Sequence, residues 1–484
     1  MDSGQREFFA SLAAVVFGNP YTPERVALIR QLAPNAPSNL ASDREALARV
    51  VAPQLKSVAA SGMAGFSAEE RALLEPAFLY VTYQRFVPQI DAHIERQADR
   101  FGEPARVDFG DEVIAELVRT GFREEAAAQY FSFFFQLRRA FYFIAQSLAG
   151  KSAPMERLRR ALWNNIFTHD MRAYQASLWS AMEDFSTLLL GETGTGKGQA
   201  AASIGRSEFI PYRPNERRFA ANFAQTFISI NLSQFPEQLI ESELFGHRKG
   251  AFTGAIDHHQ GVFERCSAHG ALFLDEIGEA AIPVQIKLLQ VLQERTFTSL
   301  GGHEQKRFSG RVIAATNRSL VELRQSGRFR DDFYYRLCSD VIHVPTLRER
   351  IQESPAELAE LVTHLVRDTV RGESRELGAY VLQVLERDLP RDYAWPGNVR
   401  ELEQAVRRVL MTGSYKPEAD ARPSLDAEGR LVARLRAGDL NADELLSAYC
   451  ALLYQRLGSY AAVAERTGLD PRTSRKYVLS AKSG

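Results

Sequence analysis

The sequence predicts a multidomain chain built around an α/β domain, with mainly helical modules on either side. Its 484 residues exceed what one hydrophobic core usually holds, so roughly three domains are expected. Between about residues 185 and 345, short apolar runs alternate with helical stretches, and the first run leads into a glycine-rich loop. Hydrophobic residues make up 45% of the chain and charged residues 25%, which is ordinary for a globular protein.

Residues 1–165 are expected to form a helical domain. Leu74–Phe86 and Tyr130–Ile144 are long, rich in aromatic residues and free of glycine. The second stretch is apolar on more than one face, which favours a buried helix. Its phenylalanine cluster could instead line a ligand pocket or face a partner. These residues contain no phosphate loop, metal cluster or nucleophile motif.

Residues 166–345 are expected to form the α/β domain itself. The apolar runs are Ser186–Leu190, Phe227–Ile230, Ala271–Leu274 and Val312–Ala315. Apolar runs separated by helices predict a parallel sheet with crossover helices.

The rest of the chain is expected to hold a lid, a linker and a small C-terminal domain. Residues 346–413 predict a helical lid that includes Ala356–Val370 and Val399–Met411. The polar residues 414–440, with several prolines and glycines, predict a linker. A small all-helical domain is expected over residues 441–484.

Charge and cysteine content narrow the possible classes of protein. The net charge of −1 gives no global attraction to nucleic acid or membrane, so any basic surface must be local. Cys266, Cys338 and Cys450 are too far apart for a paired zinc motif and fit a reducing compartment. The apolar run Leu12–Phe17 is too short to span a bilayer and no basic leader precedes it. We therefore expect a cytoplasmic protein with no membrane contact.

The glycine-rich loop after Ser186–Leu190 predicts a nucleotide site. Its GxxxxGK pattern lets backbone N–H groups surround phosphates, while Lys197 supplies positive charge. The usual magnesium-binding hydroxyl is replaced by Gly198, so magnesium must rely on phosphates, water and an acidic side chain. A glycine turn with a solvated lysine is the alternative. The expected nucleotide-binding residues are Gly191, Glu192, Thr193, Gly194, Thr195, Gly196, Lys197 and Gly198.

An acidic pair and an asparagine complete the expected site for ATP hydrolysis. Asp275 and Glu276 end the strand Ala271–Leu274, at the edge where parallel sheets place ligands. We expect Asp275 to bind Mg²⁺ and Glu276 to polarise the attacking water. Asn317, after the strand Val312–Ala315, is expected to orient that water. Simple turns are the alternative for both positions.

Three arginines are candidates for contact with the phosphates. Arg330 and Arg336 lie in one charged segment, and an arginine at a γ-phosphate offsets the charge that develops in phosphoryl transfer. Surface pairing with Asp331 or Asp332 is the alternative. Arg400 lies in the first turn of the helix that follows a Pro-Gly turn. Its alternative is a salt bridge with Glu401 or Glu403.

The stretch Gly250–Ala255, GAFTGA, is unlike a core segment. Glycine costs about 1 kcal/mol inside a helix and weakens a strand, so this stretch predicts a flexible loop. The loop would present Phe252 and Thr253 to something outside the domain.

The C-terminal residues predict a helix-turn-helix. Residues 456–484 hold six Lys or Arg against two acidic residues. A short helix ends at Gly468, and a second begins with Asp470 as N-cap and Pro471 at its first position. The expected contacts to double-stranded DNA lie near the start of that second helix: Arg472, Thr473, Arg475 and Lys476. A helical hairpin with solvated charges is the alternative.

Six segments together resemble one known family. GETGTGKG, ESELFGHRKGAFTGA, GALFLDEIGE, VIAATNR, GRFRDDFYYRL and WPGNVRELE occur here in the order found in the AAA+ domain of bacterial enhancer-binding proteins. The resemblance covers about residues 166–413. The C-terminal hairpin is similar to the Fis-type domain that ends many of these activators. Residues 1–165 lie where such activators usually carry a regulatory or sensor domain, which is therefore expected here. They show no receiver, GAF or PAS pattern, so the signal stays open.

The resemblance implies an ATPase that forms a ring, often a hexamer, and acts on the sigma-54 RNA polymerase holoenzyme. Phe252 and Thr253 would contact sigma-54. Asn231 would restrain Glu276 until ATP is sensed, and Asn317 and Arg400 would be the first and second sensors. Arg330 and Arg336 would act on the adjacent subunit's ATP.

The chain also departs from the family pattern. Thr193 and Gly198 replace Ser and Glu of the usual GESGTGKE, and Asn165–Asp170 replaces a glycine-containing segment, so an atypical adenine pocket is expected. The leading hypothesis is an ATP-dependent transcription activator. An AAA+ remodelling or DNA-processing ATPase with another substrate is the second, and a DNA-bound regulator that does not hydrolyse ATP is the third.

Overall fold

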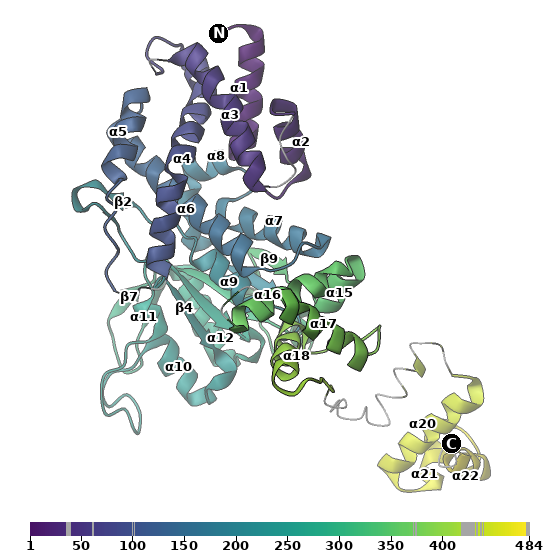
Figure 1. Cartoon of the computed structure of the whole chain (residues 1–484). Helices are drawn as coiled ribbons and strands as arrows, with labels where there is room; N and C mark the ends of the chain where they lie inside the picture. Colours follow the sequence, from purple (N-terminus) through teal and green to yellow (C-terminus); the bar gives the residue numbers. More distant parts are fainter. Residues whose placement is uncertain are drawn as a thin grey trace. The chain divides into compact units, whose positions relative to one another are not determined.

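The computed structural model describes residues 1–417 and 440–480, except 35–39, 61, 99, 101, 371 and 373–374. Between 418 and 439 it describes only residues 431, 434, 435 and 438. Most of the expected linker lies outside the described residues. The chain divides into a larger unit, Met1–Glu386 with Pro390–Gly413, and a smaller unit that holds the C-terminal helices (Figure 1). Each unit is described by itself.

The N-terminal part of the larger unit is helical, as the sequence predicts. Local signals set the helix ends: Asp2 and Gln5 form a capping box at the first helix, and Gly121, with φ 112°, ends the fifth. Buried residues such as Phe9, Phe86 and Ile90 share one core. The helices are α1 (Ser3–Phe17), α2 (Pro23–Leu32), α3 (Leu40–Ala59), α4 (Ala68–Ala98) and α5 (Gly110–Thr120).

The next helix is buried on two sides, which confirms the expectation for Tyr130–Ile144. On α6 (Glu124–Ser147), Phe131 and Phe135 belong to the N-terminal core. Phe133 and Ile144 of the same helix belong to a second core that includes strand residues of the α/β domain. Helices α7 (Ala153–Phe167) and α8 (Met171–Ala176) join this second core.

The α/β domain contains a five-stranded parallel sheet in the order β4-β5-β8-β1-β9. Four of its strands match the predicted apolar runs. The sequence missed β9 because Asp340–His343 holds only two apolar residues. The bounds are β1 (Thr187–Leu190), β4 (Phe227–Asn231), β5 (Ala271–Asp275), β8 (Arg311–Thr316) and β9 (Asp340–His343); two short hairpins are β2 (Tyr212–Arg213) with β3 (Arg218–Phe219), and β6 (Thr296–Thr298) with β7 (Gln305–Arg307).

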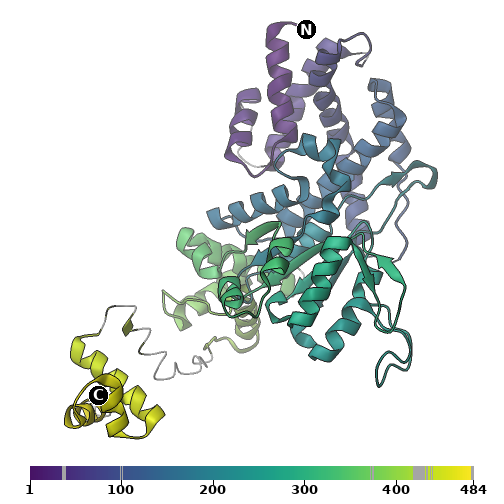
Figure 2. The same cartoon turned by 180° about the vertical axis from the view of Figure 1, so that it is seen from behind.

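Helices cover the sheet and continue into a helical lid (Figure 2). The lid helix predicted over Ala356–Val370 has those same bounds in the structure. Around the sheet lie α9 (Lys197–Gly205), α10 (Glu237–Phe245), α11 (Val262–Arg265), α12 (Ile282–Glu294), α13 (Leu320–Gln325) and α14 (Asp331–Leu337). The lid holds α15 (Leu347–Glu353), α16 (Ala356–Val370), α17 (Arg375–Asp388) and α18 (Asn398–Thr412).

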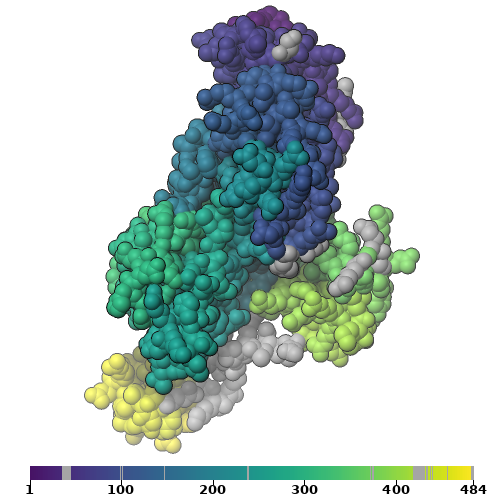
Figure 3. Space-filling view, turned by 90° about the vertical axis from the view of Figure 1, so that its left-hand side faces the viewer, coloured from purple at the N-terminus to yellow at the C-terminus, as the bar shows by residue number. Residues whose placement is uncertain are grey.

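A buried ionic cluster joins α7 to the sheet. Arg311, 2% exposed, donates to Glu208 Oε1 at 3.2 Å, to Asn165 Oδ1 at 2.9 Å and to Thr187 Oγ1 at 3.1 Å. Burial raises the pKa of Glu208, so the nearby guanidinium is what favours its ionised form. Packing therefore continues across residue 165, and Figure 3 shows the blue helices meeting the teal α/β part on one face. The boundary at 165 stays a proposal.

Between residues 440 and 480 the smaller unit has helices packed around a small core of Cys450, Leu453, Val463 and Val478. They are α20 (Ala442–Leu457), α21 (Tyr460–Thr467) and α22 (Pro471–Ser480). Gly468, with φ 72°, ends α21, and Asp470 Oδ1 accepts from the N–H groups of Arg472 and Thr473. The predicted pair of helices and its turn are confirmed. Among all described residues, no helix is long and apolar enough to cross a membrane.

We expect Arg311→Met to lower the free energy of unfolding by about 3 kcal/mol or more, because it leaves a buried carboxylate without its partner. Arg307→Met is the matched control, since Arg307 is 64% exposed in its pair with Glu183 and should cost less than about 1 kcal/mol. Urea denaturation followed by circular dichroism measures both. Equal costs would contradict the role given to the buried cluster.

Candidate nucleotide site and projecting loop

The phosphate loop connects β1 to α9, so backbone N–H groups at the start of a helix face the loop. Gly194 and Gly196 have φ of 81° and 100°, and a Cβ at Gly194 would collide with the carbonyl of Gly397. Lys197 is the first residue of α9 and donates to the carbonyls of Gly191 at 2.8 Å and Glu192 at 3.0 Å. Burial lowers the pKa of Lys197, while the carboxylates of Glu276 and Asp275 oppose that shift. Lys197 is therefore held at the loop, close to the acidic pair.

The acidic pair lies at the carboxyl end of β5. Glu276 has a left-handed backbone, φ 55°, which costs a non-glycine residue energy, and its N–H donates to Asp275 Oδ1 at 3.0 Å. Burial raises the pKa of Glu276, and the neighbouring charge of Asp275 raises it further. Lys197 and the N–H of Asn317 act in the opposite direction. This environment makes Glu276 a stronger base than a solvated glutamate.

Two asparagines lie at the ends of the strands beside β5. Asn317, after β8, donates to Thr193 Oγ1 of the phosphate loop at 2.8 Å. Asn231 ends β4 opposite Asp275 in the strand register, and its amide donates to Asp275 Oδ2 at 3.5 Å. The expected partner of Asn231 was Glu276, whereas the contact in this structure is with Asp275. Both asparagines nevertheless lie at the edge where the sequence places them.

The lid is tied to the phosphate loop by residues that the sequence reasoning missed. Arg348 forms a two-pronged ion pair with Glu192, which lowers the pKa of that carboxyl. Asn398 donates to Glu192 Oε2 at 3.1 Å and to the Thr193 carbonyl at 3.0 Å. The backbone N–H of Arg400, in the first turn of α18, lies 3.3 Å from the Gly194 carbonyl. Glu192 thus contacts the lid in this structure, although the sequence analysis assigned it to the nucleotide.

Beside the loop lies a cavity of about 230 Å³ between the lid and Leu148–Leu158, a segment that includes the start of α7. Thr195, Gly196 and Gln199 line it from the phosphate loop and α9. Apolar side chains on its other walls are Leu148, Met155 and Leu158 before the sheet, and Leu361 and Leu365 in the lid. Charged and polar side chains share those walls: Arg350, His364, Asp368, Thr369, Glu403 and Arg407. Apolar and polar groups side by side next to a phosphate loop suit a flat base that carries polar atoms. Asn165, from the segment expected to shape an atypical adenine pocket, does not line this cavity and binds Arg311.

The loop Gly250–Ala255 is closed at its base and exposed at its tip. The N–H of Gly250 donates to the Ala255 carbonyl at 2.8 Å, and that of Ala255 to the Phe252 carbonyl at 3.0 Å. Phe252 is 36% exposed, with its ring 4.9 Å from that of His247, and Thr253 is exposed. Ile256, which the sequence analysis did not single out, is 73% exposed beside this tip.

The loop belongs to the connection between β4 and β5. The chain leaves the site at Asn231, passes through α10 and the loop, and returns through α11 and β5 to Asp275. The base of the loop is held on its other side by Arg248, whose N–H donates to the Leu300 carbonyl at 3.0 Å. The polypeptide therefore connects the exposed tip to Asn231 on one side and to Asp275 on the other.

Comparison with known proteins agrees with this arrangement. The sequence profile described as the sigma-54 interaction domain matches residues 168–343. Residues 168–343 are thus similar to a sigma-54 interaction domain. This confirms the resemblance for that region and the AAA+ α/β fold class of the chain's centre.

The relatives reported below carry the names of regulators. The chain is 38% identical over 257 residues to "Regulatory protein AtoC" of Escherichia coli (strain K12), which covers 52% of this chain and 51% of that protein. It is 42% identical over 294 residues to "Nif-specific regulatory protein" of Azotobacter vinelandii, covering 59% and 52%. It is 36% identical over 283 residues to "DNA-binding transcriptional regulator NtrC" of Rhizobium meliloti (strain 1021), covering 58% and 51%. The chain thus spans about half the length of these curated relatives.

Among solved structures, NtrX from Brucella abortus in complex with ADP is similar over 77% of this chain and 80% of that chain, with 20% sequence identity and a TM-score of 0.42. Values this low carry no inference about ligands.

The two expected arginine fingers have partners within residues 168–343. Arg330 forms a two-pronged ion pair with Asp332, at 3.0 and 2.7 Å, as the surface alternative predicts. Arg336 donates to the Leu292 carbonyl at 2.9 and 2.8 Å, at the end of α12. A role at another subunit's site stays a proposal for both.

The remaining candidates lie where the sequence places them. A side chain at Gly198 would meet nothing within 4 Å, so the missing hydroxyl is not enforced by lack of space. In the smaller unit, Arg472, Arg475 and Lys476 are exposed on α22, while Thr473 is half-buried and its hydroxyl donates to Asp470. Among the described residues, no group of three or more His, Cys, Asp and Glu side chains could hold a metal. The three cysteines are free.

We expect Glu276→Gln to raise the unfolding temperature at pH 8 and to have no effect below the ordinary glutamate pKa of 4.5. A raised pKa means that the folded state binds the proton more tightly, so the ionised carboxylate destabilises the fold above its pKa and costs nothing once protonated. Thermal unfolding between pH 4 and pH 8 tests this. The exposed Glu294→Gln is the control and should change little at any pH; a destabilised Glu276→Gln protein at pH 8 would refute the argument.

Proposed function

We propose that this chain is an ATP-dependent transcription activator of the bacterial cytoplasm that binds double-stranded DNA. It hydrolyses ATP at the edge of the sheet and remodels the sigma-54 RNA polymerase closed complex through Gly250–Ala255. One observation carries the proposal. The exposed tip with Phe252 and Thr253 lies on the connection that begins at Asn231 and ends at Asp275. Asn231 and Asp275 lie at the sheet edge that also carries the phosphate loop.

The residues around Lys197 suit ATP hydrolysis. Lys197 exchanges the carbonyls of Gly191 and Glu192 for phosphate oxygens, and the loop N–H groups cradle the phosphates. Glu276 accepts a proton from the attacking water, aided by its raised pKa. Asn317 orients that water from its position on Thr193. The base lies in the cavity beside the loop, near Leu158 and Leu361.

Asp275 would hold a magnesium ion, which would neutralise charge on the phosphates. Its carboxylate lies at the end of β5, where the Asn231 amide and the Glu276 N–H contact it, and glycine at position 198 offers no hydroxyl to the ion. These residues fit a magnesium ion that binds together with the nucleotide.

We propose that the active form is a ring of identical subunits, such as a hexamer. Arg330 is 38% exposed and its partner Asp332 is 47% exposed, so the pair can be exchanged for a phosphate at low cost. Arg330 and Arg336 then act on the neighbouring subunit's ATP, where an arginine finger offsets charge in the transition state. Arg400 reaches the phosphates of its own subunit from the lid.

The C-terminal unit places the chain on DNA. Arg472, Arg475 and Lys476 are exposed near the start of α22, the second helix of the predicted helix-turn-helix. Such a helix enters the major groove with its N-terminal residues at the base edges. Lysine and arginine at this end favour contacts to bases and phosphates.

We expect Thr253→Ala to keep at least half of the ATPase rate and to reduce open-complex formation at a sigma-54 promoter by at least tenfold. The substitution changes the exposed tip and leaves the acidic edge intact. Thr253→Ser is the matched control and should retain both activities, while Glu276→Gln should lose ATP turnover by at least a hundredfold. A Thr253→Ala protein that still opens the promoter would exclude this role, and turnover by Glu276→Gln would exclude its role as the base.

We expect the double variant Arg475→Ala, Lys476→Ala to bind DNA more weakly and with a smaller salt dependence. Each lost phosphate contact lowers the slope of log K against log salt by about one. Fluorescence anisotropy from low to high salt measures this slope. Arg456→Ala, on α20, is the control, and an unchanged slope in the double variant would argue against α22 as the DNA-binding helix.

A further inference from the structure

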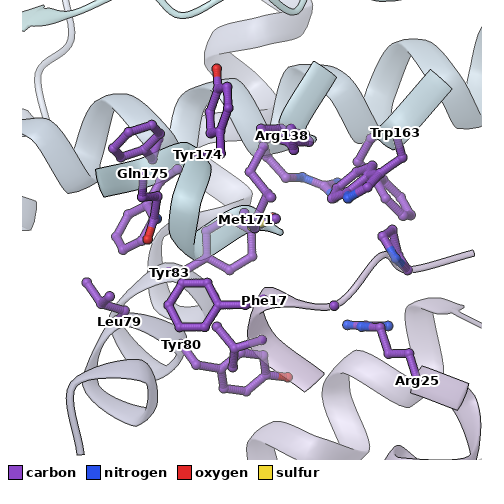
Figure 4. A pocket seen from close by; sticks show the side chains of 18 of the residues that line it. Phe17, Arg25, Leu79, Tyr80, Tyr83, Arg138, Trp163, Met171, Tyr174 and Gln175 are labelled. Atoms are coloured by element: carbon purple, nitrogen blue, oxygen red, sulfur yellow. The ribbon is translucent and has the colours of Figure 1, made fainter. Parts of the chain in front are cut away.

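A second cavity lies among the N-terminal helices. It is bordered by α1, α2, α4, α6, α7 and α8 and has a volume of about 200 Å³. Figure 4 shows Tyr174 and Gln175 on one side, Leu79 and Tyr80 on the opposite side, and Trp163 closing a third side. This cavity shares no lining residue with the one beside the phosphate loop.

Aromatic rings form most of its wall. Phe133, Trp163, Phe167 and Tyr174 are each at most 5% exposed, yet all of them border the cavity. Neighbouring rings meet edge-on or tilted, with Phe167 and Tyr174 at 5.5 Å and Trp163 and Phe167 at 4.7 Å. The cavity is partly open to solvent, so a small molecule can enter it. A concave pocket lined mostly by apolar and aromatic side chains with a few polar groups is typical of a small-molecule site.

The charged and polar lining favours an uncharged ligand. Arg138 donates to both oxygens of Asp91, at 2.5 and 2.7 Å, and its guanidinium lies 5.0 Å from the centre of the Phe141 ring. Its charge is therefore matched within the protein. Arg25 donates from Nε to the Val15 carbonyl at 2.9 Å. Gln84 and Gln175 add neutral amides that can bind one hydroxyl or ring N–H.

Size and wall chemistry together define the class of ligand. An apolar cavity of about 150 Å³ in another protein holds benzene, so the space here suits one ring or two fused rings. Aromatic walls favour a planar ring because offset and edge-on ring contacts add to the hydrophobic gain.

The wall of the cavity also contacts the helix that begins at Lys197. Gln136, on the face of α6 away from the cavity, donates to the Tyr174 hydroxyl at 2.7 Å and to the Ser207 carbonyl at 2.9 Å. Arg139 donates to the carbonyls of Arg206 and Glu208, each at 2.6 Å. Ser203 of α9 donates to the Phe143 carbonyl of α6 at 3.3 Å. Tyr174 and α6 therefore join the cavity to the end of α9 and the residues after it.

We propose that this cavity binds a small, uncharged aromatic molecule of one or two rings, and that its binding changes ATP turnover through α6 and Tyr174. The binding site is independent of the proposed ATPase function, whereas the coupling rests on it.

Binding is tested on the full chain with phenol, indole and 1-naphthol, by isothermal calorimetry and thermal shift. We expect at least one of them to bind and to raise the unfolding temperature, with cyclohexanol and benzoate at least tenfold weaker.

Leu137→Trp fills the cavity and should abolish binding. Leu137→Phe is a milder form in case the first variant does not fold. Leu73→Trp, on α4 outside the cavity, is the matched control and should bind normally. If none of the three probes binds up to its solubility limit, or if Leu137→Phe and Leu137→Trp both bind as tightly as the unaltered chain, the site is excluded.

Coupling is tested by ATP turnover with and without the probe that binds. We expect at least a twofold change in rate, which Gln136→Leu should remove while the probe still binds. Binding without any change in turnover would overturn the coupling and leave the site intact. Absence of turnover in the unaltered chain would instead refute the proposed ATPase function, while calorimetry still reports the binding site.

Discussion

The parallel register of β4, β5, β8 and β1 is the constraint on which the rest of the larger unit depends. It places the carboxyl ends of these strands at one edge of the sheet, so Asn231, Asp275, the phosphate loop and Asn317 become neighbours although the sequence separates them. Burial raises the pKa of Glu276 and lowers that of Lys197, and at this shared edge the charge of each opposes the shift of the other. The contact between Asn317 and Thr193 lies at the same edge.

Two other parts of the larger unit are linked to this edge of the sheet. One is the segment from Asn231 to Asp275, which carries the exposed tip with Phe252 and Thr253 away from the sheet. The other is the lid, where Arg348 and Asn398 bind Glu192 of the phosphate loop. A nucleotide that moves Glu192 would act on the lid, and one that moves Asn231 or Asp275 would act on the tip. A single nucleotide bound at this edge can therefore affect both.

Sequence reasoning predicted the elements that carry strong local patterns and missed those decided by packing. The phosphate loop, four strands, α16 and the Asp470 N-cap follow from spacing and apolar runs. Strand β9 was missed because Asp340–His343 has little apolar content, and its pairing with β1 fixes it. Arg348 and Asn398 carry no local signal, since only the folded lid brings them to Glu192. For the phenylalanine cluster of α6, the sequence allowed either a helical core or a ligand pocket. It could not decide between them, because the N-terminal cavity is formed by residues from six helices.

The central claim is that nucleotide at the edge of the sheet moves the projecting loop. Hydrogen exchange of the Gly250 and Ala255 amides tests it most directly, because both close the base of the loop through hydrogen bonds. The measurement compares the full chain alone, with ATP and magnesium, and with ADP and aluminium fluoride as a transition-state analogue. We expect exchange at these two amides to change between the nucleotide states, together with protection of the phosphate loop. Protection of the phosphate loop with unchanged exchange at Gly250 and Ala255 would contradict it.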